Sequence, residues 1–237
     1  MENEPIILYE DNQIIVAVKP QNVPTQADSS GDERFLDIVK NYVKVKYNKP
    51  GNAFIGLVHR LDRPTGGVMV FARNSKSAER LCTQIAQGDL TKKYLAVTVG
   101  TPRDSRARLS NWLQKDEKEN MVRVLPARSE GAKFAELDYK VLESNEKVAL
   151  LDVNLYTGRS HQIRAQLSNV GCPVFGDAKY GGTTLAKGHN LALWAYQLTF
   201  THPTQKNTMV FKVFPPTDKT PWKLFRVEKY INTVKPE

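Results

Sequence analysis

The chain of 237 residues is long enough to bury a sizeable core, and its 41% hydrophobic and 25% charged residues argue against a disordered protein. It carries 34 Lys and Arg residues against 25 Asp and Glu residues, a net charge of +9, which favours a polyanionic partner such as RNA, DNA or an acidic membrane surface. The only cysteines, Cys82 and Cys172, form neither a CxxC pair nor a disulfide framework, and no apolar run approaches the roughly 18 residues that span a membrane.

The N-terminal residues 1–5 are acidic and contain no apolar secretory stretch. Together with the cysteine count, this predicts a soluble cytoplasmic protein with no membrane partner.

The first part of the chain alternates short strands with helices. Strands are expected at residues 6–9, 14–18, 56–58 and 67–71. Apolar residues at helical spacing predict a helix over 35–45. A second helix is expected from Asn74 or Ser75, which can cap its start, to Gln87, where Gly88 ends it.

The second part is richer in strands. Residues 93–99 alternate in polarity, and further strands are expected at 134–142, 148–154, 191–200 and 208–213. The polar, Arg-rich stretch 102–131 reads as a loop or hairpin insertion. Helices are expected at 160–170 and 222–230. Strands outnumber helices without a βαβ rhythm, which predicts an α+β fold with a mixed, largely antiparallel central β-sheet flanked by helices and loops.

Three segments carry unusual residues. The first, residues 59–67 (HRLDRPTGG), is a loop between two apolar runs, where functional residues are common. Asp62 stands there between Arg60 and Arg63, and neighbouring cations favour an ionised carboxylate that can act as nucleophile or base. A solvated turn is the alternative for this segment taken alone.

The other two segments are 92–97 (KKYLAV) and 157–164 (TGRSHQIR). Tyr94 shares a strand face with small residues and could stack on a base, although a core tyrosine is the alternative. In the predicted helix, Ile163, Leu167 and Val170 share a buried face, whereas Arg164 falls on a more polar face with His161 and Ser168. Arg164 can therefore project toward a partner, or be an ordinary surface arginine.

Together these segments resemble the RluA family of RNA pseudouridine synthases. The resemblance covers most of the chain. It includes Glu10-Asp11-Asn12, Lys19-Pro20, the HRLD block at 59–62, KYLA at 93–96, GRSHQIR at 158–164, and finally Gly171, Pro173, Gly176-Asp177 and Tyr180-Gly181.

The resemblance implies an isomerase with the pseudouridine synthase fold that converts uridine in structured ribosomal or transfer RNA to pseudouridine, after flipping the base out of its stack. It implies three catalytic residues: Asp62 as the nucleophile, Tyr94 as stacking partner of the uracil and candidate base, and Arg164 as the ion-pair partner of Asp62. Whether Asp62 attacks C1′ of the sugar, attacks C6 of the base or assists glycal formation stays open.

Arg60 is expected to fill the vacated space in the RNA. Further RNA contacts are expected from Thr65, Arg159, His161, Lys92, Lys93 and Lys179, and from the basic segment with Arg103, Arg106, Arg108 and Arg123.

The reaction requires no redox cofactor, and the four histidines show no zinc-ligand spacing, so neither cofactor nor metal is expected. The family often has Thr-Ser-Gly after the aspartate, where this chain has Thr65-Gly66-Gly67; the glycine keeps the turn but lacks a hydroxyl. Many members also have a preceding S4-type RNA-binding domain, and this chain starts directly at the catalytic domain. We therefore expect residues 1–237 to form a single catalytic domain that selects its target by itself, as a monomer with no obligatory protein partner.

Two other classes of protein are considered. An RNA-binding or assembly factor without chemistry would not require the set Asp62, Tyr94 and Arg164. A hydrolase using Ser160 and His161 is disfavoured, because adjacent residues of a helix point in different directions and no Gly-x-Ser-x-Gly motif is present.

Overall fold

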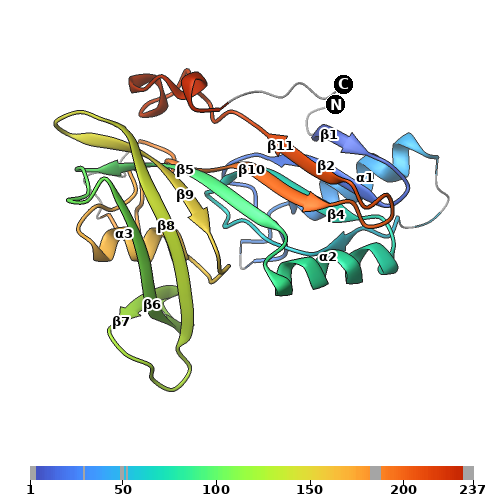
Figure 1. The fold of residues 1–237 in the computed structure, drawn as a ribbon. Coiled ribbons are helices and arrows are strands. Elements are labelled where there is room, and N and C mark those ends of the chain that lie inside the picture. Colours follow the sequence, from blue (N-terminus) through green and yellow to red (C-terminus); the bar gives the residue numbers. More distant parts are fainter. Residues whose placement is uncertain (1–3, 29, 49–50, 52, 182–187, 232–237) are drawn as a thin grey trace. The chain divides into compact units, whose positions relative to one another are not determined.

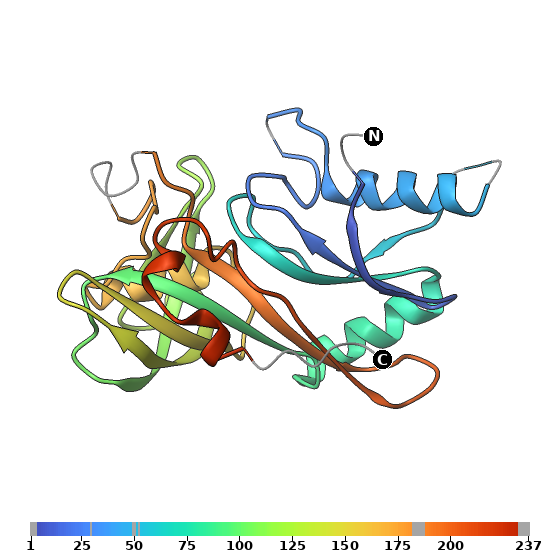
Figure 2. The ribbon, with the colours of Figure 1, turned by 90° about the horizontal axis from the view of Figure 1, so that it is seen from above.

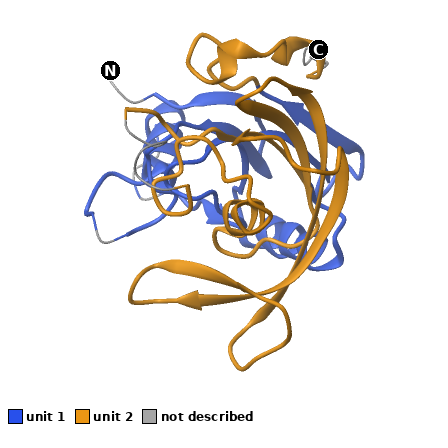
Figure 3. Cartoon of the chain, turned by 90° about the vertical axis from the view of Figure 1, so that its left-hand side faces the viewer, with its two compact units in different colours: residues 1–91, 196–213, 233–237 blue, residues 92–195, 214–232 orange. Residues whose placement is uncertain are grey.

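The structure is a computed structural model that describes residues 4–28, 30–48, 51, 53–181 and 188–231. The chain divides into two compact units, coloured blue and orange in Figure 3. Unit 1 contains residues 1–91, 196–213 and 233–237, and unit 2 contains residues 92–195 and 214–232. The strands are mostly antiparallel and outnumber the helices, which confirms the predicted α+β class.

Unit 1 is built on strands in the order β1, β2, β4, β10 and β11, with β3 pairing to β4 (Figure 1). Their bounds are β1 (Ile6–Glu10), β2 (Ile14–Lys19), β3 (Gly56–Leu57), β4 (Gly66–Ala72), β10 (Leu193–Thr201) and β11 (Thr208–Lys212). Every residue of β4 is buried. This continuous burial, without alternation, is expected of a strand whose two faces are both covered.

Two helices provide that cover, α1 (Phe35–Lys46) and α2 (Ser75–Gln87), which lie on either side of the strands in Figure 2. The ring of Phe35 in α1 packs 5.8 Å from that of Phe71. The next residue, Ala72, points to the opposite face and pairs with Gly56, whose added Cβ would lie 3.2 Å from Ala78 in α2. The helices therefore bury alternate residues of β4.

The predicted ends of α2 are confirmed. The Asn74 side chain accepts a hydrogen bond from the Ser77 N–H at 2.8 Å, and Gly88 ends the helix with φ +82. A helix that ends in this way needs a residue with left-handed backbone angles, and glycine adopts them without strain.

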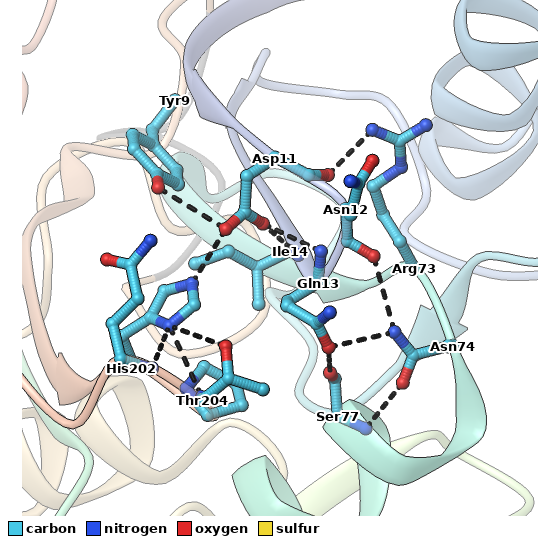
Figure 4. A network of polar contacts seen from close by, with 12 residues as sticks. Tyr9, Asp11, Asn12, Gln13, Ile14, Arg73, Asn74, Ser77, His202 and Thr204 are labelled. Atoms are coloured by element: carbon cyan, nitrogen blue, oxygen red, sulfur yellow. Dashed lines mark hydrogen bonds and ion pairs between the residues drawn. The ribbon is translucent and has the colours of Figure 1, made fainter.

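A polar network joins the β1–β2 turn to the β10–β11 turn (Figure 4). The Asp11 carboxylate accepts from the backbone N–H of Gln13 at 2.7 Å and of Ile14 at 2.8 Å. It also lies 2.9 Å from Nε2 of the buried His202. Because His202 Nδ1 accepts from the Gln205 N–H at 3.0 Å, Nε2 carries the proton and donates to Asp11. The network fixes the start of β2, the strand that leads to Lys19.

Unit 2 is built on strands in the order β5, β9, β8, β6 and β7. Their bounds are β5 (Thr91–Val99), β6 (Arg106–Asp116), β7 (Met121–Leu125), β8 (Lys133–Ser144) and β9 (Val148–Leu155). The predicted strands 93–99, 134–142 and 148–154 are confirmed with small shifts of their ends. Of the two alternatives for residues 102–131, the structure has the hairpin, formed by β6 and β7.

Helix α3 (Gln162–Asn169) packs on one face of this sheet, where Ala165 joins Leu113, Val122 and Ala135 in a buried cluster. The predicted buried face is confirmed at Ile163 and Leu167 but not at Val170, and the predicted polar face with Arg164 is wrong. Residues 162–167 are all buried, Arg164 included, and Val170 is 41% exposed. The polar side chains of α3 are buried because they find partners inside the fold: the Gln166 amide, for example, donates to the Leu109 carbonyl and to Asn111.

The predicted C-terminal helix over 222–230 is also wrong. Two short 3₁₀ helices, Trp222–Leu224 and Val227–Lys229, are separated by extended backbone at Phe225. Trp222, Phe225 and Val227 are all buried, and this spacing does not place them on one face of an α-helix. Within the described parts of the chain, none of the helices has the length and hydropathy of a membrane-spanning segment.

Candidate active site

The loop that carries Asp62 runs from β3 to β4 and is anchored through its backbone. The Asp62 carbonyl accepts from the Thr65 N–H at 2.9 Å, which closes a tight turn. Next to it, Leu61 is bracketed by the Thr25 hydroxyl, which donates to its carbonyl at 2.8 Å. The Gln21 amide donates to the Pro64 carbonyl at 3.0 Å. These bonds fix the backbone on both sides of Asp62, whose side chain is half-buried.

Lys19, at the end of β2, holds this loop through the hydrogen bonds of its side chain. Its fully buried ammonium donates to the carbonyls of Val23 at 2.6 Å, Pro20 at 2.9 Å and Arg63 at 3.2 Å. Burial lowers the pKa of Lys19 to about 7, while the Asp62 charge acts in the opposite direction and the Arg63 charge lowers it further. The ammonium and amine forms are therefore close in free energy at neutral pH.

We expect Lys19→Met to destabilise the protein by about 2–4 kcal/mol, because the carbonyls of Pro20, Val23 and Arg63 lose their charged donor. The variant should also change the pH dependence of stability. Between pH 7 and about 10.5 the unfolded chain binds more protons at Lys19 than the folded chain, so the wild type gains stability as pH rises, by at most about 1.4 kcal/mol per pH unit. Urea unfolding from pH 7 to 10 measures both effects.

Lys76→Met, at an exposed position of α2, is the matched control and should leave stability and its pH slope unchanged. A Lys19→Met protein with the stability and slope of the wild type would contradict the bracing role.

The other residues of the HRLD loop have different surroundings. Arg60 is exposed, as a residue that enters RNA must be. The Arg63 guanidinium forms ion pairs with Asp28, at 3.4 Å, and with Asp32. These two carboxylates partly compensate its positive charge, so that charge does not act on Asp62 alone. Thr65 is buried, and its hydroxyl has no hydrogen-bond partner among the described residues. A buried hydroxyl without a partner is costly, and the contact of Thr65 with the uridine stays a prediction.

Tyr94 lies in β5 on a row of the unit 2 sheet with Val153 and Tyr139, and its side chain is buried. Lys92 shares its strand face, lies close to Gly158, and has a pKa lowered by burial. Lys93 points to the other face and pairs with Asp152 at 3.7 Å. Of the two lysine contacts predicted on β5, the structure thus brings only Lys92 to the face of Tyr94.

Arg164 is held by a bidentate ion pair with Asp177. Its Nε donates to one carboxylate oxygen at 2.7 Å and its Nη2 to the other at 2.8 Å, and both side chains are almost completely buried. Asp177 also accepts from the backbone N–H groups of Lys179 and Tyr180. Gly176 precedes it at φ +76, where any Cβ would collide with the Asn190 carbonyl. The pair fixes the plane of the guanidinium, which has five N–H donors and can serve a second acceptor.

Tyr180 covers this arginine. Its ring centroid lies 5.2 Å from the Arg164 guanidinium carbon, and its hydroxyl accepts from the Val122 N–H at 2.8 Å. The same hydroxyl lies 2.9 Å from Nδ1 of His161, which begins α3 with a left-handed φ of +50. A non-glycine residue in this region is uncommon and often marks a functional site. Unit 2 therefore brings His161 and Arg164 together around Tyr180.

The remaining predicted RNA contacts lie on the surface of unit 2. The Lys179 ammonium donates to the Asn120 carbonyl at 2.8 Å, and Arg159 Nε donates to the Phe134 carbonyl at 2.9 Å. The other four are the exposed Arg103, Arg106, Arg108 and Arg123. Asp62 belongs to unit 1, whereas Tyr94 and Arg164 belong to unit 2, so the pairing of Arg164 with Asp62 stays a prediction.

Several residues that support the site were not predicted as parts of it, namely Lys19, Gln21, Thr25, Asp177 and Tyr180. Lys19 and Asp177 both stand in blocks that carry the family resemblance, and this was their only signal, because their partners are distant in sequence. Among the described residues, no group of three or more His, Cys, Asp or Glu side chains is arranged to hold a metal ion.

Known proteins of similar sequence and fold point to one family. The family model described as RNA pseudouridylate synthase matches residues 13–169. An uncharacterized RNA pseudouridine synthase of Aquifex aeolicus is 34% identical over 91% of this chain and 71% of its own length. A ribosomal large subunit pseudouridine synthase C of Buchnera aphidicola subsp. Schizaphis graminum is 32% identical over 83% of this chain and 63% of its own.

A solved structure, human RNA Pseudouridylate Synthase Domain Containing 4, is similar with a TM-score of 0.75 and 26% identity, over 89% of this chain and 88% of that one. This confirms the predicted pseudouridine synthase fold. The chain spans about two thirds of the length of the two curated relatives above. The match to the family model covers more than half of the chain and includes the HRLD and GRSHQIR blocks, and this chain therefore belongs to the RNA pseudouridine synthase family of isomerases.

Proposed function

We propose that this protein converts specific uridines of ribosomal RNA to pseudouridine, with Asp62 as its nucleophilic carboxylate. The observation that carries the proposal is the anchoring of the Asp62 loop, in which Lys19, Gln21 and Thr25 hold the neighbouring carbonyls while the carboxylate stays half-buried. A backbone that is fixed on both sides of Asp62 positions its carboxylate for reaction. The ribosomal target is supported by the relatives that are named ribosomal large subunit pseudouridine synthase C.

The reaction breaks the bond between C1′ and N1 of uridine and forms a bond between C1′ and C5. The hydrogen on C5 leaves as a proton, N1 gains one, and nothing is oxidised or hydrolysed overall. The Asp62 carboxylate assists the first step by attack at C1′, by attack at C6 or by promoting glycal formation. A base must then remove the C5 proton, and we propose the Tyr94 hydroxyl for that role.

The target uridine must leave its stack to reach Asp62, at a cost of a few kcal/mol. We propose that stacking on Tyr94 offsets this cost and that the exposed Arg60 fills the vacated space. Phosphate contacts come from the basic surface residues of unit 2. The two units act as one catalytic domain in a cytoplasmic monomer.

Release of tritium as water from RNA labelled at uridine C5 tests the proposed activity, because the C5 hydrogen is lost only when C1′ joins C5. Protein-free ribosomal RNA and a transfer RNA pool should be supplied in parallel, each unmodified. We expect release from ribosomal RNA at a stoichiometry of one or a few uridines per molecule. Release from transfer RNA alone would overturn the ribosomal target, and release from neither would overturn the activity.

Tyr94→Phe should slow the chemical step by at least about a hundredfold while leaving RNA affinity within about threefold. Phenylalanine keeps the ring that stacks but removes the proposed base. Single-turnover kinetics at saturating RNA separate the chemical step from binding. Tyr139→Phe, the same change at a buried tyrosine two strands away in the same row, is the control and should react at the wild-type rate. An unchanged rate for Tyr94→Phe would leave Tyr94 with a stacking role only.

A further inference from the structure

The outward face of the β6–β8 strand pair and the residues beside it carry three aromatic side chains and several arginines. Even-numbered residues point outward on both strands, with Arg108 opposite Asp138, Ser110 opposite Glu136 and Trp112 opposite Phe134. Tyr156, just after β9, joins this face through its backbone bond to Glu136. Phe134 is 40% exposed and Tyr156 is 46% exposed.

Two of the three aromatic rings lie beside an arginine guanidinium. The Arg108 guanidinium carbon lies 4.6 Å from the ring centroid of Tyr156, and that of Arg128 lies 5.7 Å from the centroid of Trp112. The Trp112 and Phe134 rings pack edge to face at 5.6 Å. Arg159 completes the group by donating to the Phe134 carbonyl. We name the set Arg108, Trp112, Arg128, Phe134, Tyr156 and Arg159 the arginine–aromatic face.

The acidic side chains on this face already have partners. The Tyr156 hydroxyl donates to Asp138 at 2.6 Å, which also fixes the orientation of the ring. Glu136 accepts from the Ser110 hydroxyl at 2.9 Å and lies 4.0 Å from Arg108. Further along the same strands, Arg106 and Lys140 stand directly opposite each other. Like charges at such a position destabilise the sheet, so their presence favours an anionic partner.

The arginine–aromatic face lies on the side of the sheet away from the catalytic residues of unit 2. Helix α3, with Arg164, packs on the other side through Leu113 and Ala135. Tyr94 stands in a row with Tyr139, which belongs to the inward, odd-numbered set of β8. A ligand bound on the arginine–aromatic face therefore contacts none of the groups assigned to the chemistry within this unit.

We propose that the arginine–aromatic face binds an unpaired segment of the RNA substrate, outside the target uridine. Aromatic rings and guanidinium planes stack on any base, and arginines contact phosphates, so this combination suits single-stranded RNA. Base pairing hides the faces of the bases, so duplex RNA fits it less well. The proposal rests on the proposed function only in taking RNA as the substrate, and it adds a site that contributes affinity and target choice but no catalysis.

Tryptophan emission offers a direct reading of occupancy. Trp194 and Trp222 are buried, whereas Trp112 lies on the arginine–aromatic face. Titration with a single-stranded oligouridine RNA should quench the emission, and a duplex RNA of equal length should quench it far less. Trp112→Phe should remove the quenching while keeping most of the affinity, measured separately by anisotropy of a labelled RNA.

The contribution of the exposed aromatic rings to RNA affinity is tested with the double variant Phe134→Ala, Tyr156→Ala. We expect its affinity for single-stranded RNA to fall at least about tenfold, while Phe54→Ala, an exposed aromatic in unit 1, changes nothing. Arg108→Gln should lower the slope of log affinity against log salt by about 1, and Arg226→Gln, an exposed arginine elsewhere in unit 2, should not. At saturating substrate RNA, the single-turnover rate of the double variant should equal that of the wild type.

Wild-type affinity in a double variant that melts like the wild type would overturn the proposal, as would an equal loss for single-stranded and duplex RNA. If the double variant does not fold, a variant that combines Arg108→Gln with Arg128→Gln tests the site instead. Unchanged affinity of that variant for single-stranded RNA would contradict the proposal. The titrations measure RNA binding and need no turnover. Absence of pseudouridine formation by the wild type would therefore contradict the proposed function without affecting the test of this binding site.

Discussion

Asp62→Asn is expected to lower pseudouridine formation by at least about a thousandfold while RNA affinity stays within about threefold of the wild type. Asparagine keeps the shape of the side chain but loses the charge required of a nucleophile. Folding should be preserved, because the bonds that anchor the loop involve the backbone of residues 61–65 and the side chains of Lys19, Gln21 and Thr25. Single-turnover tritium release and RNA anisotropy measure the two quantities on the same preparation.

Asp89→Asn provides the matched control, because it makes the same chemical change at an exposed position of unit 1. It should react and bind as the wild type does. Turnover of Asp62→Asn within about tenfold of the wild type would falsify the nucleophile assignment. A large loss of RNA affinity would instead indicate that Asp62 acts mainly in binding.

Arg164→Lys is expected to lose at least about tenfold in the chemical step, because an ammonium cannot hold two carboxylate oxygens with the planar geometry of a guanidinium. Arg164→Ala should be worse. It leaves the Asp177 carboxylate buried without its cation, which costs about 3–5 kcal/mol of stability. The sequence predicted Asp62 as the partner of Arg164, whereas the ion pair in the structure is with Asp177. The carboxylate that loses its known partner in Arg164→Ala is therefore that of Asp177. Thermal melts beside single-turnover rates distinguish unfolding from loss of chemistry.

A double-mutant cycle with Asp177→Asn tests whether Asp177 acts through Arg164. If it does, the double variant should lose little more in the chemical rate than the worse of the two single variants. Additive losses would contradict the coupling of Asp177 to Arg164. A wild-type rate for Arg164→Lys would contradict the proposed pairing of Arg164 with Asp62.

Local patterns predicted most elements of the fold. Helix α2 has a capping Asn74 and a terminal Gly88, and β9 follows the predicted run almost residue for residue. The β6–β7 hairpin was recognised only as one of two alternatives. The outward positions of β6 carry Arg106, Arg108 and Ser110. On its inner face Leu113 is buried but Asn111 is polar and only half-buried, so no continuous apolar stripe marks the strand.

Helix α3 shows what one sequence does not reveal. The sequence places Arg164 on a polar face, but the buried side chains of Gln162, Arg164 and Gln166 bond to partners outside the helix: the Glu136 carbonyl, Asp177 and Asn111, respectively. The identity of the candidate site residues came from the HRLD and GRSHQIR blocks. Their supports came from the structure, because the bonds of Lys19 to Arg63 and of Arg164 to Asp177 depend on the folded path of the chain.

Mapping of pseudouridine across cellular RNA, with and without this protein, tests the central claim most directly. Cells that lack the protein should lose pseudouridine at one or a few uridines of ribosomal RNA. Expression of the wild type should restore them, and expression of Asp62→Asn should not. Unchanged ribosomal RNA in the deletion, or restoration by Asp62→Asn, would contradict the account.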